Sequence, residues 1–323
     1  MAADKHVLEA WSNVLGSPHV RELTPDRVWE VSDQGDARYV LKRISGQFAD
    51  PARRFIDEAR VLSFLQEQGL PVAVPVPCDN GSVYAADASG ALFALTPMLP
   101  AGETSSAAPL DAADAARYRN VGATIARMHV ALARCPFDID ASQEGRGRLG
   151  PDRFPELWRH LEATLPAPVF DDLAGRVGPW REAIMRALDD PHVQRVHGDV
   201  HGGNILTDHD AVTGVIDVDH LPLAPRSYDL GYYLAFCVHW HIGQDDVRRP
   251  VERSVAFEAR HLLTGYDTVS TLTRRESDAL PAMSLAVALM LLDYFLTTEG
   301  IAEGSWIRTA RWITGHPDTL GPS

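Results

Sequence analysis

One stretch of this chain concentrates side chains that could transfer a phosphoryl group. It reads His197-Gly-Asp-Val-His-Gly-Gly-Asn204, so an amide follows the carboxylate of Asp199 by five residues. Two more carboxylates, Asp217 and Asp219, come thirteen and fifteen residues after the amide. Transfer of a γ-phosphate to an alcohol needs a base for the attacking hydroxyl and oxygen ligands for Mg²⁺. These residue types in this order therefore indicate an ATP-dependent kinase.

The residues around these groups predict how the backbone would position them. Three glycines within the stretch permit a tight path, so a loop rather than a helix would carry Asp199 and Asn204. The apolar run Val212-Thr-Gly-Val-Ile-Asp-Val is typical of a short buried strand. Such a strand would deliver Asp217 at its end.

A lysine far upstream also points to nucleotide chemistry. The chain has two lysines among its 30 basic residues, and one of them, Lys5, belongs to a predicted leading helix. The other, Lys42, falls in Arg38-Tyr-Val-Leu-Lys-Arg-Ile44, a run with strand propensity. Its compact ammonium would fit between the α- and β-phosphate oxygens and an acidic partner. The alternative is an ordinary surface lysine on an edge strand.

The next predicted helix, Pro51 to Gln68, offers the acidic partner. Its apolar residues recur at helical spacing, a proline begins it and a glycine follows it. Glu58 lies beside the apolar stripe, so it would face the sheet and pair with the lysine. Asp57 is the second candidate. A surface pair between Glu58 and Arg54 or Arg60 is the alternative that periodicity leaves open.

Together these motifs resemble the aminoglycoside phosphotransferase superfamily of small-molecule kinases, which includes choline, homoserine and methylthioribose kinases. The similarity extends from about Val20 to about Ala302 and is most specific between Val196 and Leu234. Within that segment, the resemblance implies that Asp199 is the catalytic base. It also implies that Asn204 and Asp217 hold the metal.

Two further segments carry the resemblance. Arg226-Ser-Tyr-Asp-Leu-Gly-Tyr-Tyr233 matches the family's aspartate, here Asp229, which braces the catalytic loop and begins a helix. Ala123-Thr-Ile-Ala-Arg-Met-His129 resembles the helix that precedes the family's substrate region.

The fold that the resemblance implies is α+β, two-lobed and protein-kinase-like, with a small mixed N-lobe and a larger, mainly helical C-lobe. Residues 1–97 would form the nucleotide-binding lobe, 98–102 a hinge and 103–323 the catalytic and substrate lobe. ATP and Mg²⁺ would bind in the cleft between the lobes. Met98 of the hinge would pack on the adenine, although a methionine there could equally fill the core.

The chain departs from the wider kinase pattern at the loop that would cover the phosphates. No G-x-G-x-x-G precedes Lys42, and the corresponding turn reads Leu23-Thr-Pro-Asp-Arg-Val-Trp29. Thr24 and Arg27 are the candidates for phosphate contacts in that turn.

Four other side chains are candidates for the acceptor pocket. Asp219 would bind a second Mg²⁺ or a substrate amine, and Asp293 would be an acidic contact for a cationic substrate. His220 and Tyr228 would either line the pocket or pack the loop. No motif identifies the acceptor, because a fold does not choose its substrate.

Three alternatives stand beside a small-molecule kinase. His197, Asp199 and His201 could hold a transition metal in a hydrolase. That hypothesis leaves Lys42 and Asn204 without a role, so we interpret both histidines as loop-packing residues. A protein Ser/Thr kinase of the same fold would use the same hydroxyl chemistry. A non-catalytic nucleotide-binding module is disfavoured because the base, metal and lysine positions are all present.

Composition narrows the choice of partners. The 323 residues suffice for two lobes, and the net charge of -14 argues against a nucleic-acid or anionic-membrane surface. The charge favours a cationic small-molecule substrate. We find no run of about 18 apolar residues and no signal peptide, so we expect a cytoplasmic protein without a membrane span. Three widely spaced cysteines fit free thiols, and the oligomeric state stays open.

Periodicity and turn signals predict the remaining elements. A leading helix is expected at residues 4–15, and strands are expected at 19–23, 28–31, 38–44, 82–86 and 92–96. Beyond the hinge, helices are expected at 110–133, 151–165, 171–188, 229–241, 250–266, 275–299 and 305–314.

Overall fold

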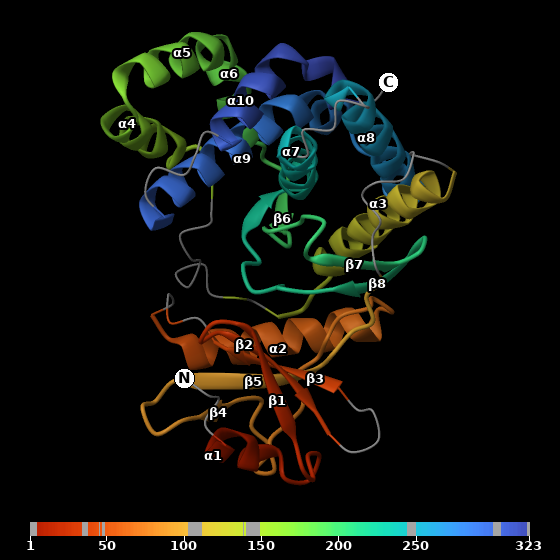
Figure 1. Cartoon of the computed structure of the whole chain (residues 1–323). Helices are drawn as coiled ribbons and strands as arrows, with labels where there is room; N and C mark the ends of the chain where they lie inside the picture. Colours follow the sequence, from red (N-terminus) through yellow and green to blue (C-terminus); the bar gives the residue numbers. More distant parts are fainter. Residues whose placement is uncertain are drawn as a thin grey trace.

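Five antiparallel strands form the sheet of the N-terminal part, at the bottom of Figure 1. The structure, a computed structural model, describes residues 5–33, 38–44, 46, 49–102, 112–137, 139, 149–243, 250–299 and 305–321. The spatial order of the strands is β1, β2, β3, β5, β4. Their bounds are β1 (His19–Thr24), β2 (Val28–Ser32), β3 (Arg38–Arg43), β4 (Ala85–Ala86) and β5 (Leu92–Pro97).

One face of this sheet packs against the first turns of the chain. Short helices α1 (Lys5–Leu8) and η1 (Glu9–Trp11) bring Trp11 into a cluster with Trp29 and Leu41. Successive side chains of a strand point to opposite faces of its sheet. Burial of Leu41 in this cluster therefore places its neighbour Lys42 on the other face, the one that α2 covers in Figure 1.

Helix α2 (Pro51–Glu67) joins the sheet to the rest of the molecule. The side chain of Asp50 caps it by accepting a hydrogen bond from the backbone N–H of Arg53, at 3.0 Å. Leu62 and Leu65 belong to the hydrophobic core of the helical part and not to the cluster beneath the sheet. The helix therefore inserts apolar side chains into the core of the C-terminal part.

The C-terminal part is mainly helical. Helix α9 contacts α4, α6, α7 and α10, while α3 packs along α8. The helices are α3 (Ala112–Leu132), α4 (Phe154–Thr164), α5 (Ala167–Val177), η3 (Gly178–Trp180), α6 (Arg181–Leu188), α7 (Ser227–Gly243), α8 (Val251–Asp267), α9 (Arg274–Glu299), α10 (Ser305–Gly315) and η4 (Pro317–Thr319). This architecture confirms the α+β class expected from the sequence.

Two short antiparallel strand pairs between α6 and α7 frame the catalytic segment. Strand β6 (Val193–Arg195) pairs with β9 (Leu223–Pro225), and β7 (Ile205–Asp208) pairs with β8 (Ala211–Val215). The first pair closes the ends of the segment, and the second, a hairpin, lies inside it. Together the two strand pairs hold residues 193–225, the stretch of backbone that carries the candidate catalytic residues.

Helix α9 bears on the expectation that the chain has no membrane span. By length and composition alone, Arg274–Thr298 is long and apolar enough to cross a membrane. However, 67% of its most apolar 18-residue stretch is buried inside the structure, and Leu285 and Leu289 are fully buried. Ser284 and Asp293 interrupt its apolar residues, and the helix forms the central core helix of the C-terminal part.

Other predicted bounds also shift. The helix expected at 171–188 breaks into α5, η3 and α6 at Gly178-Pro179, because proline lacks the N–H that a continuing helix needs. The strand expected at 212–218 ends at Val215, which leaves Asp217 two residues beyond it. The leading helix shrinks to α1 and η1. The lobe bounds stay a prediction, since residues 103–111 lie outside the described residues.

Candidate active site

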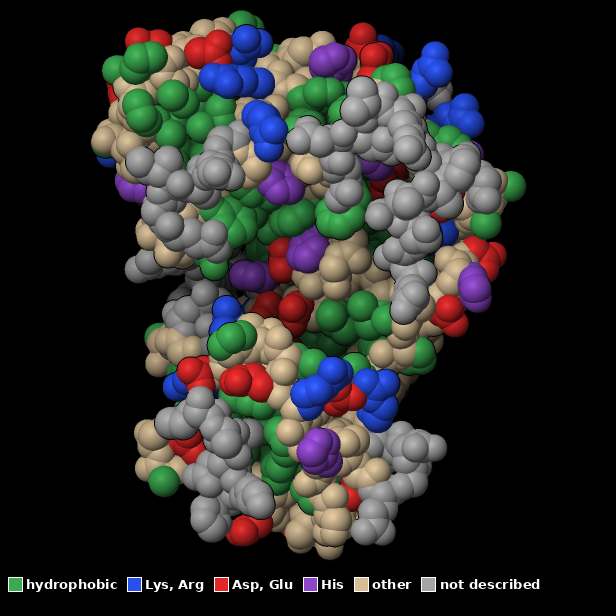
Figure 2. Space-filling view, in the orientation of Figure 1, with side chains coloured by type: hydrophobic (Ala, Val, Ile, Leu, Met, Phe, Trp, Pro, Cys, Tyr) green, Lys and Arg blue, Asp and Glu red, His purple; other side chains and the backbone are tan. Residues whose placement is uncertain are grey.

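Lys42 reaches across the molecule to the predicted metal segment. Its Nζ donates to Asp217 Oδ1 at 2.6 Å and to Asp219 Oδ2 at 3.3 Å. Burial lowers the pKa of the lysine, but the charges of Asp219, Asp217 and Glu58 outweigh burial and raise it. The ammonium is therefore fully charged near neutral pH. Figure 2 shows this waist of the molecule, where acidic and histidine side chains line a hollow.

Glu58 lies close to this cluster but is not the bonded partner of Lys42. Nζ of Lys42 instead forms ion pairs with Asp217 and Asp219. Burial and the charge of Asp219 raise the pKa of Glu58 to about 8, against the opposing effect of Lys42 and Arg54. The predicted Lys42–Glu58 pair is thus replaced by a wider group of charges. Asp57 binds Arg53 and Arg60 instead, so it is not the partner either.

Asp199 and Asn204 form a hydrogen-bonded unit. Asn204 Nδ2 donates to Asp199 Oδ2 at 2.8 Å and to the Asp199 carbonyl at 2.9 Å. Burial raises the pKa of Asp199, but hydrogen bonds with His201 and Tyr232 and the charge of His220 lower it to about 2. The carboxylate is ionised at neutral pH and oriented by its neighbours.

The hairpin of β7 and β8 brings the two predicted metal ligands together. Ile205 faces Val215 across the hairpin, and beyond that pair Ile216 N–H donates to the Asn204 carbonyl at 3.0 Å. Asp217 follows at once, with φ 57°, a left-handed conformation that aspartate tolerates better than most residues. The donor set is an amide oxygen and a carboxylate, which suits a hard divalent cation. The residues present therefore fit such an ion.

A buried polar network fixes the catalytic loop from behind. Asp229 of α7 accepts from the backbone N–H of His197 at 2.9 Å and of Gly198 at 2.8 Å. Asp229 Oδ2 also lies 2.9 Å from Nε2 of His129 in α3. Asp229 and His129 are both fully buried. The bracing role that the resemblance implied for Asp229 is what the contacts describe.

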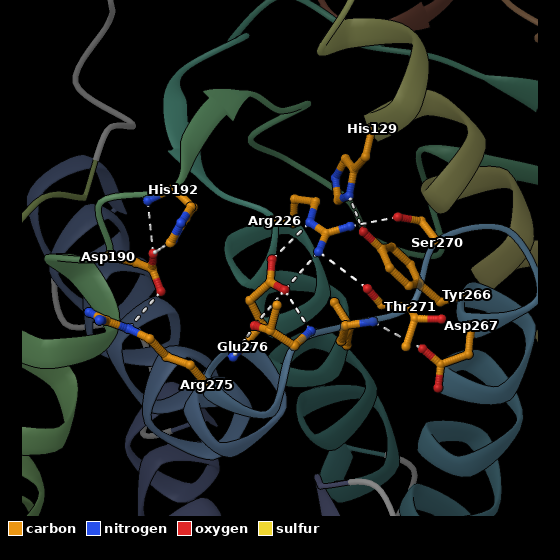
Figure 3. Close-up of polar contacts among 12 residues, drawn as sticks. His129, Asp190, His192, Arg226, Tyr266, Asp267, Ser270, Thr271, Arg275 and Glu276 are labelled. Carbon is orange, nitrogen blue, oxygen red and sulfur yellow. Dashed lines mark hydrogen bonds and ion pairs between the residues drawn. The ribbon is translucent and has the colours of Figure 1, made fainter.

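The network continues into the loop before α9, as Figure 3 shows. His129 Nδ1 lies 2.8 Å from the Tyr266 hydroxyl, and Tyr266 also bonds to Arg226. The guanidinium of Arg226 forms two hydrogen bonds with Glu276, at 2.8 and 2.7 Å. Nearby, Arg275 pairs with Asp190 at 2.9 Å. The catalytic loop is thereby connected to α3, α8 and α9.

Both histidines of the loop have structural contacts. His197 Nδ1 accepts from Asp199 N–H at 3.2 Å, and its Nε2 donates to the Ile216 carbonyl at 3.0 Å. His201 Nδ1 accepts from Gly203 N–H at 3.0 Å, and its ring stacks on Phe236. These contacts agree with the loop-packing interpretation.

Gly198 shows why this loop needs a glycine. Its φ is 89°, and an added Cβ would lie 2.5 Å from Pro222 and 3.0 Å from the Cβ of His220. The catalytic loop therefore packs directly on the segment that carries Asp217 and Asp219. A side chain at this position would push the base and the metal segment apart.

The acceptor candidates separate into accessible and inaccessible groups. Tyr228 is 1% exposed and donates to Met290 Sδ at 3.4 Å, so it is a core residue and not a pocket wall. Asp293 on α9 is already paired with His160 of α4. Asp219 and His220 are half-buried beside the lysine. Burial raises the pKa of Asp219, but the charges of Lys42 and His220 and the hydrogen bond from Lys42 together lower it.

Two residues that the sequence analysis missed lie at the site. Tyr232 of α7 bonds to Asp199, and it stacks on Phe236 one turn further along the helix. The four-residue spacing from Tyr228 was a usable signal for a shared helix face. Arg54 was considered only as a surface partner of Glu58. It is 1% exposed, and its Nη2 donates to the carbonyls of Asp219 and His220.

The hinge and the phosphate-covering turn are described only through their backbone contacts. Met98 is half-buried, and its N–H donates to the Arg38 carbonyl at 2.9 Å. Thr24 and Arg27 are exposed and close a turn through Arg27 N–H and the Thr24 carbonyl, at 3.1 Å. Their contacts with a nucleotide stay predictions.

The hydrolase alternative finds no support in the described residues. His197, Asp199 and His201 do not converge as metal ligands there. The group that does is Cys237, His241 and Glu258, whose potential ligand atoms lie within 4.8 Å of one another. In that group Glu258 accepts hydrogen bonds from Tyr233 and His241, each at 3.0 Å, which accounts for its burial.

Comparison with known proteins finds relatives that align over most of this chain. Homoserine kinases of Methylobacillus flagellatus and Methylobacillus glycogenes are each 28% identical to this chain. The first aligns over 83% of this chain and 74% of its own length, the second over 77% and 70%. Among solved structures, an amicoumacin kinase complex superposes with a TM-score of 0.69 at 18% identity, over 98% of this chain and 92% of its own. A microcompartment-associated aminopropanol kinase gives a TM-score of 0.68 at 18% identity, over 97% and 94%.

The structural neighbours establish the fold as that of small-molecule phosphotransferases, which confirms the two-lobed, protein-kinase-like expectation. The sequence pattern of the phosphotransferase enzyme family matches residues 21–269, which include the lysine, the catalytic loop and the metal segment. This chain therefore belongs to the phosphotransferase enzyme family.

Proposed function

We propose that this protein transfers the γ-phosphate of ATP to the hydroxyl of a small, amine-bearing alcohol. The observation that carries the proposal is the meeting of Lys42 with Asp217, 175 positions away in the chain, at 2.6 Å. This ion pair places the lysine at the segment that follows the hydrogen-bonded Asp199 and Asn204. A base, two oxygen donors and a fixed cation in one place are the groups that phosphoryl transfer uses.

Asp199 is the residue that would meet the acceptor hydroxyl. With a pKa of about 2 it is a weak base, so its main work is to accept the hydroxyl hydrogen bond and aim the oxygen at the phosphate. A weak base suffices when the transition state is loose, because the hydroxyl gains little positive charge before the phosphate is transferred. Tyr232 would hold the carboxylate in that orientation.

Asn204 and Asp217 would hold the divalent cation, expected to be Mg²⁺. The amide nitrogen of Asn204 is engaged by Asp199, which directs its carbonyl oxygen Oδ1 to the metal. The bound cation would supply positive charge to the phosphate oxygens. Lys42 would exchange its aspartates for the α- and β-phosphates, and Glu58 would then be its nearest remaining carboxylate. Met98 would contact the adenine.

The choice of acceptor rests on chemistry shared among the relatives. Homoserine, aminopropanol and glucosamine, named in the relatives' activities, each carry an amine and a hydroxyl. Asp219 and His220 offer polar contacts beside the lysine. A substrate amine that bound Asp293 would have to share this carboxylate with His160. The free thiols Cys78, Cys135 and Cys237 agree with a reducing, cytoplasmic setting.

ADP release is the test. Purified protein with ATP and Mg²⁺ would be incubated with L-homoserine, aminopropanol, glucosamine, an aminoglycoside, matching alcohols without the amine, and a serine peptide. We expect ADP release above background with an amine-bearing alcohol and its loss in Asp199→Asn. Release with the peptide alone would favour a protein kinase. Tight ATP binding without release in any arm would favour a binding module.

A further inference from the structure

Arg54 is a buried charged residue of α2 that the catalytic argument does not use. It lies in the first turn of the helix, yet it is only 1% exposed, whereas arginine is rarely buried unless its fork is bonded. Its Nη2 lies 2.7 Å from the carbonyl of Asp219 and 2.7 Å from the carbonyl of His220. One nitrogen therefore holds two consecutive peptide units, 165 and 166 positions away in the chain.

The segment that Arg54 holds has an unusual backbone. Asp217 has φ 57° and Leu221 has φ 43°, so two non-glycine residues within five positions are left-handed. Such conformations persist only where surrounding contacts over-determine them. The backbone N–H of Ile216 and that of Leu221 are bonded to the catalytic loop, at 3.0 and 3.2 Å. Arg54 supplies the contact in the middle, between those two ends.

Lys42 and Arg54 hold the same segment by different atoms. The lysine bonds to the carboxylates of Asp217 and Asp219, which are also groups that a metal or substrate would use. The arginine's two contacts with this segment are to main-chain oxygens, so they would be kept when those carboxylates change partners. Because α2 packs into the core of the helical part through Leu62 and Leu65, the arginine rests on a fixed support.

We infer that Arg54 is a positioning residue that fixes the Asp217 segment in its metal-binding conformation and ties it to α2. This inference rests on the proposed function. The guanidinium nitrogen carries two hydrogens in a fixed plane, which suits two adjacent carbonyls. Lysine has a shorter side chain, and its ammonium lacks that planar geometry. The expected consequence is a specific loss of metal-assisted nucleotide binding.

The experiment compares ADP binding with and without Mg²⁺ by titration calorimetry, in wild type and in Arg54→Gln, Arg54→Met and Arg54→Lys. Loss of an outer contact to a ligand segment lowers metal affinity by about 10–100-fold. We expect the gain in ADP affinity from Mg²⁺ to fall by about tenfold in the Gln and Met variants, with metal-free ADP affinity changed less than about twofold. In Arg54→Lys, the gain in ADP affinity from Mg²⁺ should lie between that of these variants and that of wild type.

Arg53→Gln is the matched control, because Arg53 is the neighbouring arginine of α2 and is largely exposed, with Asp57 as its partner. It should behave as wild type. Steady-state assays should show a raised Mg²⁺ requirement and a lower kcat in the Arg54 variants, with the acceptor KM unchanged. A folded Arg54 variant that keeps the full Mg²⁺ gain would overturn the inference while leaving the function intact. If Gln and Met fail to fold, the charge-conserving Lys variant alone decides. Wild type without any Mg²⁺ gain would overturn both proposals.

Discussion

The two sides of the site are built in different ways. On the catalytic-loop side, Asp229 and His129 are fully buried and hold the backbone on which Asp199 lies. On the lysine side, Lys42 is 35% exposed and Asp217 44% exposed, and they bond to each other through side chains. Buried networks with every partner satisfied are rigid, whereas exposed ion pairs are weak and exchange partners easily. The base is therefore pre-positioned, and the lysine side is the one that can adapt to a nucleotide.

The largest expected effect comes from the catalytic side. Asp199→Asn keeps an oxygen that can accept the hydrogen bond of Asn204, so the loop should hold its shape. Loss of the carboxylate should lower kcat by about 10²–10⁴-fold, the usual contribution of a general base. Stopped assays of product formation would measure kcat, and calorimetry would show ADP affinity unchanged. Full turnover in this variant would remove Asp199 from its role.

The bracing aspartate should give the largest loss of stability. Asp229→Asn replaces one of two accepting oxygens by an amide that faces backbone N–H donors at 2.8 to 2.9 Å. We expect the free energy of unfolding to fall by about 3 kcal/mol, measured by urea denaturation. Asp172→Asn is the control, since Asp172 pairs with Arg176 and Arg311 at the surface and should change the midpoint little. Equal losses in both variants would contradict the special contribution of the buried aspartate to stability.

The lysine side should respond in binding more than in stability. Lys42→Met removes the charge-assisted contacts, and ATP affinity should fall by about 10–100-fold, from the usual strength of hydrogen bonds to charged groups. Arg43→Met, one residue along β3 and exposed, is the matched control and should bind ATP normally. Calorimetric titration would separate the two. A Lys42 variant with unchanged affinity would end the assignment.

The smallest effect is a pH dependence that belongs to Glu58. Burial raises its pKa from 4.5 to about 8, so the folded state keeps a proton that the unfolded chain loses. Its contribution to stability is present below pH 4.5 and is lost as pH rises through about 8. Urea midpoints of wild type should fall over that window relative to Glu58→Gln. Parallel pH curves for the two proteins would count against a raised pKa.

The sequence allowed prediction of those parts of the site whose signal is local. The strand that carries Lys42 and the glycine-rich loop with Asp199 and Asn204 follow from spacing and residue type. The bounds of β1, β2 and β5 agree within one or two residues for the same reason. The lysine's preference for Asp217 and Asp219 over Glu58 was not predictable, because it depends on distances across 175 positions of chain.

Side chains whose role depends on tertiary packing escaped the sequence analysis. Arg54 looks like any surface arginine until α2 is placed against the metal segment, and Tyr228 looks like a pocket residue until the first turns of α7 are placed in the core. His129 was recognised only as part of a helix. The pair of β6 and β9 has three residues in each strand, too few for an alternating pattern to emerge.

The central position of α9 has a consequence for how the protein is made. A ribosome releases this helix only after α7, whose buried leucines and tyrosines it covers, has already emerged. Until then α7 exposes an apolar surface that a chaperone must shield or that will aggregate. A premature stop before Arg274 would leave every catalytic residue in the chain and still yield an insoluble product.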